Sequence, residues 1–403
     1  MSKPTDAATT IVGAGAVGCA VALHLARAGW KDVQVIESHD VAEATTGQAA
    51  GLVGQVRSTV DRTRLAMASV NLFSRLEKET GYPPDWRQTG SIRIALTADR
   101  AAEFERMAAI ARSAGLETEF LSNAQVTDRF PLLDTTAIRA ALWCPTDGYL
   151  QPHSLTTAYA RAARDLGVTF CPHTTVTGVD VRDGVVEGLR TSAGDIRTDL
   201  VINAAGPWAA GLAAMIGVDL PIIPVRHEYF VSTPTPGWSP DLPVLRIPDL
   251  HLYVRAELRS VLCGGWEARA LSRDPRRDPV VPIEPDWDVL TGFATDLETV
   301  VPGASQLRVA EVFRGWPAFA PDGRFVVGPV PGVRGFVMAA ACNAHGVSGS
   351  AGLAEYVMES MRPDPSPYVQ SLSPARFLPN TFDWTDAQTK ARAVYENYYA
   401  LTS

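Results

Sequence analysis

The chain has 403 residues, of which 46% are apolar and 20% charged, and its formal net charge is −8. This length and apolar content allow one large domain or two intertwined domains with proper cores, and they argue against wholesale disorder. The acidic balance argues against a nucleic-acid partner, because phosphate binding needs a dense basic face. The five cysteines include no CxxC pair, which predicts neither a disulfide framework nor a zinc site and fits a reducing compartment.

The N-terminal region predicts a βαβ unit within about 30 residues. A short buried strand at 9–12 precedes a glycine-rich turn, a helix follows to about Ala28, and a second strand occupies 33–36. The apolar run at 11–26 is too short to span a bilayer and lacks the basic start and cleavage site of a secretory signal. We therefore expect a cytoplasmic protein without a membrane partner.

The middle of the chain first alternates helices and strands and then becomes mostly extended. Further helices are expected at 63–80, 100–114, after His153 up to Leu166, and at 346–361, and further strands at 91–96, 168–170, 176–182, 185–191 and 200–202. From 221 to about 311, extended segments at 229–232, 251–255 and 260–264 alternate as in an antiparallel sheet. This order indicates two domains that are interleaved along the chain.

A dinucleotide fingerprint lies in the first turn. Gly13, Gly15 and Gly18 follow the first strand, and Glu37 closes the next strand, 24 positions after Gly13. The first glycine permits the tight turn, the second lets a pyrophosphate approach the backbone, and the third allows close packing of helix and strand. The free N–H groups of the helix would face the phosphates, and Glu37 would accept hydrogen bonds from a ribose. The fingerprint alone does not separate FAD from NAD.

Four groups of segments resemble the D-amino-acid-oxidase-like flavoproteins, within which the chain is similar to the dimethylglycine and sarcosine dehydrogenase branch. These are AAGLVGQVRS at 49–58 with its continuations at 63–65, 76–81 and 86–93, NAAGPWA at 203–209, PAFAPDGRFVVG at 317–328, and NAHGVSGS at 343–350. The resemblance extends over about residues 9–359 and implies FAD as the cofactor. It also implies an α/β fold: a Rossmann-like FAD domain from 1–87, 145–218 and 312–403, interleaved with an α+β substrate domain from 88–144 and 219–311. The substrate domain is expected to be an antiparallel sheet with helices on one face.

The fingerprint and the resemblance together imply a specific FAD site. Its expected residues are Gly13, Gly15, Ala16, Val17, Gly18, Glu37, Ser38, Thr45, Thr46, Gln48, Ala49, Ala50, Gly51, Leu52, Val176, Ala204, Ala205, Gly206, Trp208, Gly346, Val347, Ser348 and Gly349. In the dimethylglycine dehydrogenase pattern a histidine before the AAGL sequence carries a covalent flavin, but this chain has Gln48 there. The region around Gly315, where monomeric sarcosine oxidases use a cysteine, has none. We therefore expect noncovalent FAD.

The resemblance also places candidate catalytic and substrate-binding residues. His227 matches a histidine that faces the substrate in the family, and an imidazole titrates near neutrality, which suits proton transfer. Tyr253 matches an active-site tyrosine. Arg57 is the first candidate for binding a substrate carboxylate, with Arg255 and Arg314 as rivals. His345 lies in the last glycine-rich turn, where it either tunes the flavin or only packs.

The resemblance, with His227 and Tyr253 in place, implies oxidation of a small secondary or tertiary amine, such as the N-substituted glycines sarcosine and dimethylglycine. The imine product would hydrolyse to an amine plus an aldehyde or glyoxylate. The electron acceptor is O2 or an electron-transfer protein. The family's dehydrogenases carry a C-terminal folate-binding region that lies outside these 403 residues, so we expect no capture of formaldehyde within this chain. Two alternatives remain: a 2-hydroxy-acid or polyol dehydrogenase, and a flavin-binding subunit of a larger assembly.

Overall fold

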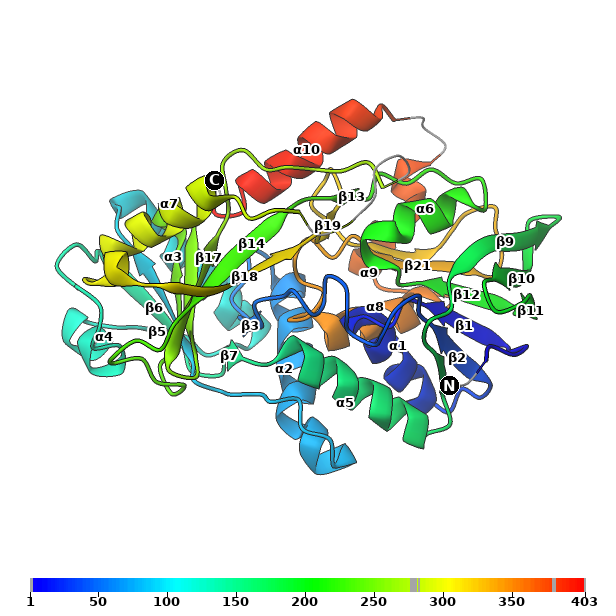
Figure 1. Ribbon diagram of the computed structural model, residues 1–403, viewed down its shortest axis with the longest axis horizontal. Coiled ribbons are helices and arrows are strands. Elements are labelled where there is room, and N and C mark those ends of the chain that lie inside the picture. The colour runs from blue at the N-terminus through cyan, green and yellow to red at the C-terminus, as the bar shows by residue number, and fades with distance from the viewer. Residues whose placement is uncertain (1–2, 276–280, 282, 379–381, 402–403) are drawn as a thin grey trace.

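The computed structural model describes residues 3–275, 281, 283–378 and 382–401. The expected domain ranges also include 1–2, 276–280, 282, 379–381 and 402–403, which lie outside the described residues. Two large sheets dominate the molecule, one in each lobe (Figure 1).

The first lobe is built on a six-stranded sheet. Its order is β20 (Val326–Pro329), β21 (Phe336–Ala340), β12 (Leu200–Asn203), β1 (Thr9–Val12), β2 (Val33–Ile36) and β8 (Thr169–Cys171). Neighbouring strands are parallel except β20, which is antiparallel to β21. The strands therefore come from three separated parts of the chain, as the interleaved pattern predicted.

Both faces of this sheet are covered, so its central strands are buried along their whole length. On one face, Ile11 and Val35 pack against α1 (Ala16–Arg27), α5 (Pro152–Asp165) and α8 (Ser350–Ser360). On the other face, Val12 and Ile36 pack against α6 (Ala209–Ala214) and a three-stranded antiparallel sheet. That small sheet consists of β9 (Val176–Arg182), β10 (Val185–Thr191) and β11 (Ile196–Arg197).

The second lobe is built on an eight-stranded sheet. Its order is β18 (Val309–Gly315), β14 (His227–Ser232), β17 (Ser260–Gly265), β16 (Leu252–Glu257), β15 (Val244–Ile247), β4 (Ser91–Ala95), β6 (Ala140–Cys144) and β5 (Glu119–Phe120). The expectation of an antiparallel sheet holds for every pair except β15 and β4, which are parallel. This pair joins the two chain segments that supply the sheet.

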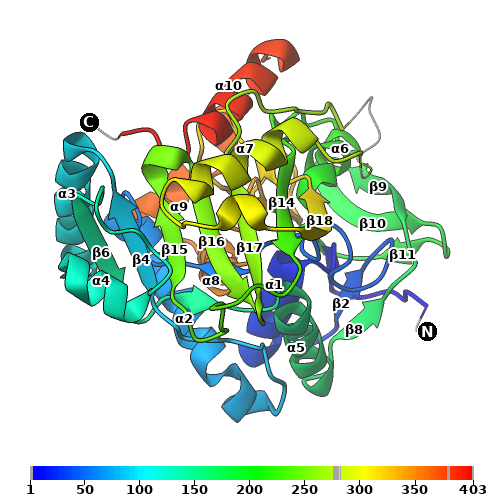
Figure 2. The same ribbon diagram turned by 60° about the vertical axis from the view of Figure 1, so that its left-hand side comes forward.

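Helices cover both faces of the second sheet, so the expectation of helices on one face was wrong. α7 (Trp287–Glu298) and α4 (Asn123–Arg129) pack against one face, while α3 (Ala98–Ala114) packs on the opposite face at β4 and β6. Figure 2 shows α7 lying across β14–β17 and α3 at the far edge. α7 also corrects the expectation that 221–311 is extended throughout. Its N-cap is Asp286, whose side chain accepts a hydrogen bond from the Val289 N–H.

The C-terminal segment lies over the junction of the lobes. α10 (Trp384–Glu396) packs against the two-stranded ribbon of β13 (Ile223–Pro224) and β19 (Ala318–Phe319), above which it lies in Figure 1. It also contacts Trp266, at the end of β17. The segment was expected within the FAD domain, and the expected boundary at 311/312 falls inside β18. The remaining elements are α2 (Val60–Thr80), α9 (Pro367–Ser371), β3 (Leu52–Val53), β7 (Gly148–Tyr149) and the 3-10 turns Gly206–Trp208, Pro248–Leu250, Ala304–Gln306 and Pro374–Phe377.

Candidate active site

A cavity of about 1000 Å³ lies between the two lobes and contains most of the expected cofactor residues. At one end it is lined by the fingerprint turn and Glu37, and at the other by His227 and Tyr253. Of the expected cofactor residues, only Gly18 and Gly349 do not line it. A Cβ on Gly18 would lie 1.9 Å from the Gly13 carbonyl oxygen, and a Cβ on Gly349 would lie 2.8 Å from Leu65 Cδ2. Both glycines therefore allow close packing behind the cavity wall.

The fingerprint turn has the geometry of a pyrophosphate site. Gly13 has φ +108°, and a Cβ there would lie 2.5 Å from the Ala204 carbonyl oxygen, so only glycine fits. The N-cap of α1 is Gly15, which has no side chain to cap the helix, and Thr46 Oγ1 accepts a hydrogen bond from the Ala16 N–H at 3.1 Å. The other first-turn donors face the cavity end where phosphates would lie.

Backbone hydrogen bonds hold Glu37, the acidic residue expected to bind the ribose. One carboxylate oxygen of Glu37 accepts a hydrogen bond from the Ala14 N–H at 2.8 Å, and the other accepts one from the His39 N–H at 2.9 Å. These bonds hold the carboxylate at the end of β2, on the cavity wall. The glycine-rich turn, the N-terminus of α1 and the Glu37 carboxylate together fit a dinucleotide such as FAD.

Gln48 lies on the cavity wall beside β18. Its Oε1 accepts a hydrogen bond from the Arg314 N–H at 3.3 Å. A Cβ on Gly315 would lie 3.1 Å from Gln48 Cβ, so Gln48 lies directly against Gly315. Neither residue has a nucleophilic side chain.

The substrate end of the cavity is built on one face of the eight-stranded sheet. Alternation along each strand sends Val254 and Cys263 into the core under α7, and Tyr253 and Arg246 to the cavity. Strand pairing then places side chains in a row across this face. In order along the row they are Phe313, Tyr229, Gly264, Tyr253, Arg246 and Arg93.

Because Gly264 has no side chain, the Tyr253 side chain can tilt across this position, out of its own row and toward the row that contains His227. A Cβ on Gly264 would lie 2.4 Å from Tyr253 Oη and 2.6 Å from Tyr229 Cβ. The tyrosine ring therefore occupies the space where another residue's side chain would be. In this position its hydroxyl reaches His227, two residues before Tyr229 on β14.

His227 is held between two tyrosine hydroxyls. Its Nε2 is hydrogen-bonded to Tyr253 Oη at 2.7 Å, and its Nδ1 to Tyr395 Oη at 3.0 Å. Its ring centroid lies 5.0 Å from that of Trp266. Burial lowers the pKa of His227 to about 4, so the imidazole is neutral near pH 7. The two candidates from the sequence, His227 and Tyr253, are therefore in direct contact in the structure.

Residues near the C-terminus complete the substrate end, and the sequence pattern did not reveal them. Tyr395 comes from α10, and Tyr398 lines the cavity while its ring stacks on Trp266 with centroids 3.7 Å apart. Tyr398 Oη lies 3.0 Å from His345 Nε2. Because His345 Nδ1 faces the Asn343 carbonyl oxygen at 2.7 Å, Nδ1 donates and Nε2 accepts from Tyr398. Burial and the nearby arginines hold the pKa of His345 well below its usual range.

The arginines divide into cavity-lining and structural groups. Arg57 lines the cavity, and burial lowers its pKa to about 10, still well above neutrality. Arg255 does not line it: its guanidinium donates to the Ala50 carbonyl oxygen at 2.8 Å and pairs with Glu257 at 2.7 Å. Arg255 therefore holds the AAGL segment rather than facing a substrate. Arg246, which sequence reasoning missed, lines the cavity instead.

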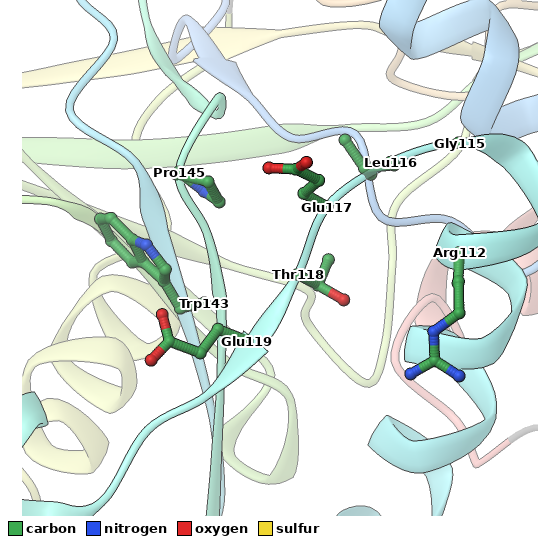
Figure 3. Close-up of a pocket in the computed structure, with 8 residues that line it drawn as sticks. All are labelled: Arg112, Gly115, Leu116, Glu117, Thr118, Glu119, Trp143 and Pro145. Carbon is green, nitrogen blue, oxygen red and sulfur yellow. The ribbon is translucent and has the colours of Figure 1, made fainter.

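A second cavity, of about 570 Å³, lies beside β5 and β6 in the second lobe and contains none of the expected site residues. Figure 3 shows its lining, where Trp143 and Glu119 are register partners. Across the part of the chain that the structure describes, three or more His, Cys, Asp or Glu side chains nowhere gather in a way that could hold a metal ion. Within the same residues, every helix is too short or too polar to cross a membrane.

This two-lobed fold, with a dinucleotide cavity that leads to a hydrogen-bonded histidine–tyrosine pair, is that of the flavin-dependent oxidoreductases. The family model described as "FAD dependent oxidoreductase" (DAO) matches residues 9–360, and the chain belongs to this family. The resemblance and the fold class inferred from the sequence are thereby confirmed.

Individual relatives fit this assignment. Dimethylglycine dehydrogenase of Rattus norvegicus is 31% identical over 405 residues, covering 97% of this chain and 47% of that protein. A formaldehyde-forming 4-methylaminobutanoate oxidase of Paenarthrobacter nicotinovorans is 31% identical over 359 residues, covering 88% and 44%. The chain thus spans slightly less than half the length of these relatives. L-proline dehydrogenase from P. horikoshii has a similar fold, with a TM-score of 0.85 at 24% identity over 93% of this chain and 98% of that one.

Proposed function

We propose that the protein oxidises a small secondary or tertiary amino acid, of the N-substituted glycine type, with noncovalently bound FAD. The observation that carries this proposal is the His227–Tyr253 pair, which lines the same cavity as the dinucleotide fingerprint. The names of two relatives, dimethylglycine dehydrogenase and 4-methylaminobutanoate oxidase, support N-methylated amino acids as the substrate class. Gln48 and Gly315 support a noncovalent cofactor, since neither side chain can form a flavin bond.

The reaction requires an unprotonated amine and a C–H bond directed at the cofactor. When bound, FAD supplies the acceptor for the hydride that leaves the carbon next to nitrogen. Arg57 binds the substrate carboxylate and fixes the orientation of the amine. The ammonium proton moves to Tyr253 Oη as the hydroxyl proton of Tyr253 moves to His227 Nε2. Loss of the proton and then the hydride leaves an iminium ion, which water hydrolyses to an amine and a carbonyl compound with release of a proton.

The low pKa of His227 is compatible with this role. An imidazole with a pKa of about 4 is unprotonated near pH 7, so His227 Nε2 can accept the proton. The substrate ammonium loses its water in the same cavity, which makes it more acidic as well. Tyr395, on the far side of the ring, accepts a hydrogen bond from Nδ1 and stabilises the imidazolium that forms.

The test is to precipitate the purified protein with acid and then, on fresh protein without oxygen, to add sarcosine, dimethylglycine and N-alkylglycines. Yellow FAD released into the supernatant and bleaching of the bound flavin by one of these amines are the expected results. Colour that stays in the pellet would contradict noncovalent binding. Bleaching by 2-hydroxy acids alone would contradict amine oxidation. Reoxidation by air, compared with an artificial electron acceptor, distinguishes O2 from an electron-transfer protein.

A second candidate function is that of a flavin-binding subunit in a larger assembly. It is favoured by one relative, the pyruvate dehydrogenase phosphatase regulatory subunit of Mus musculus, 28% identical over 90% of this chain and 42% of that protein. A subunit of this kind would bind FAD, resist reduction by every amine tested and co-purify with a partner. Location in the cytoplasm stays a prediction, since several relatives are named as mitochondrial.

A further inference from the structure

The substrate end of the cavity carries more positive charge than one carboxylate would balance. Two guanidinium groups, those of Arg57 and Arg246, line it, and Arg93 is the strand neighbour of Arg246 in the same row. The acidic residues that line the cavity, Glu37 and Glu43, both belong to the opposite end, beside the fingerprint turn. Among the residues that the structure describes, the cations near the substrate therefore face no acidic side chain across the cavity.

One buried carboxylate lies behind these arginines, and its hydrogen bonds go elsewhere. Asp147 accepts bonds from the Gln55 N–H, from Gln55 Nε2 and from Ser91 Oγ. Within the described residues, none of the three arginines forms an ion pair within 4.0 Å. The three positive charges of Arg57, Arg93 and Arg246 against the single negative charge of Asp147 leave a surplus of two.

Arg246 has hydrogen-bonding capacity that the protein leaves unused. Only 6% of Arg246 is exposed, and its Nη1 donates to Tyr399 Oη at 3.2 Å. Its Nε is buried and has no hydrogen-bond partner among the described residues. Arg57 forms no hydrogen bond to any residue that the structure describes. Arg93, by contrast, donates to the Val56 carbonyl oxygen and does not line the cavity. A buried donor without a partner is costly, so the Arg246 guanidinium is suited to an anionic ligand group, and the guanidinium of Arg57 lines the same cavity.

The register of the sheet places Arg246 next to the catalytic pair. Arg246 on β15 is directly opposite Tyr253 on β16, and both side chains lie on the cavity face. A ligand group bound by Arg246 would therefore lie one strand away from the hydroxyl that contacts His227. A second acidic group on a small substrate can therefore reach Arg246 while the amine lies beside Tyr253.

We propose that the amino acid oxidised at this site is an N-substituted dicarboxylic acid, with one carboxylate bound by Arg57 and the other by Arg246. This inference rests on the proposed function and narrows its substrate class. The second carboxylate belongs either to the amino-acid side chain or to the nitrogen substituent, and each supplies the same charge to Arg246. Binding both carboxylates fixes two points of the substrate and so orients the reacting C–H bond between them.

A binding experiment on the FAD-loaded protein tests this without turnover. Unreactive acids of matched length are titrated while the flavin spectrum is followed: propionate against malonate, butyrate against succinate, and pentanoate against glutarate. A charge-assisted hydrogen bond to the second carboxylate predicts at least about tenfold tighter binding for the best diacid. Equal affinities within every pair would overturn the proposal.

Variants assign the effect to Arg246. Arg246→Met should reduce the preference for the diacid to about twofold while leaving butyrate binding nearly unchanged. Arg62→Met is the matched control, because Arg62, like Arg246, lowers the pKa of His345 by its positive charge but does not line the cavity. It should leave the preference intact. If the methionine variant does not fold, Arg246→Lys keeps the charge and should weaken diacid binding through loss of the two-pronged contact. A full preference in a folded Arg246 variant would overturn the assignment.

Substrates then separate the failure of this inference from failure of the proposed function. N-methylaspartate, N-methylglutamate and iminodiacetate are compared with sarcosine and N-methylalanine in anaerobic flavin reduction. Faster reduction by a dicarboxylic amine supports both proposals. Reduction by the monocarboxylic amines alone would leave amine oxidation standing and refute the dicarboxylate. No reduction by any of them, with diacid preference in the titrations, would refute amine oxidation while retaining the two-carboxylate site.

Discussion

Removal of the Tyr395 hydroxyl tests whether the C-terminal segment takes part in proton transfer. Tyr395→Phe leaves His227 Nδ1 without its partner at 3.0 Å, in a place where Tyr395 is buried and His227 is half-buried. An unsatisfied buried polar group costs about 1–3 kcal/mol. If that cost falls on the imidazolium that forms during proton transfer, the rate of flavin reduction should fall by roughly 5- to 150-fold, since each 1.36 kcal/mol is a factor of ten.

Rapid-mixing measurements across pH separate this role from a structural one. Without Tyr395 Oη the imidazolium is less stable, so the pKa of His227 falls further and the acidic limb of the rate profile moves to lower pH. Binding of an unreactive carboxylate should be nearly unchanged. Tyr356→Phe is the matched control, since it removes a partly buried hydroxyl that bonds to the Asp61 carbonyl oxygen at 3.1 Å, away from the cavity. Equal rates for Tyr395→Phe and wild type, or equal losses in both variants, would refute the reasoning.

Three further predictions concern packing and pH. Gly264→Ala should displace Tyr253, whose hydroxyl would lie 2.4 Å from the new Cβ. Anaerobic flavin reduction should then slow by at least about tenfold, with an overpacking cost of about 1–3 kcal/mol in unfolding free energy, and an unchanged rate would contradict the geometry. Gly18→Ala should abolish FAD retention on a desalting column, because its Cβ would lie 1.9 Å from a backbone oxygen, whereas Gly292→Ala in α7, with nothing within 4 Å, should retain it. The folded pKa of His227, about 4, lies below its unfolded value of about 6.5, so its contribution to stability is complete above pH 6.5 and is lost as pH falls toward 4. Between pH 6.5 and 4, the unfolding free energy of His227→Asn should therefore fall less steeply than that of the wild type, by about 1.4 kcal/mol per pH unit. Parallel curves of unfolding free energy against pH for the two proteins would rule out the lowered pKa of His227.

The sequence predicted those parts of the fold that local pattern determines. The fingerprint unit was found at the strand and helix that the structure contains, because strand, turn and helix signals are contiguous there. The helix expected at 346–361 begins instead at Ser350, because 346–349 form a turn, of which 346–348 line the cavity. The helix α7 was missed although its N-cap Asp286 and the spacing of Leu290, Phe293 and Leu297 were readable. The many prolines before it suggested extended chain.

Sequence patterns located individual site residues within single segments but not the contacts between segments. His227 and Tyr253 were identified through a family resemblance, but their contact depends on the empty space at Gly264, which no local signal announces. Arg246 shares its row with Tyr253 only through the pairing of β15 with β16. The contact of Tyr395 with His227 joins positions 168 residues apart, a separation that pattern reading does not bridge.

The C-terminal segment has a consequence for how such a site can change. Tyr395, Tyr398 and Tyr399 contact His227, His345 and Arg246 respectively, yet none of the three belongs to either large sheet. Substitutions in this segment can thus reshape the substrate end without breaking a strand pair or touching the fingerprint turn. Chains that share both sheets can diverge in substrate preference through these few positions, and a library of variants confined to them would explore specificity while the scaffold stays constant.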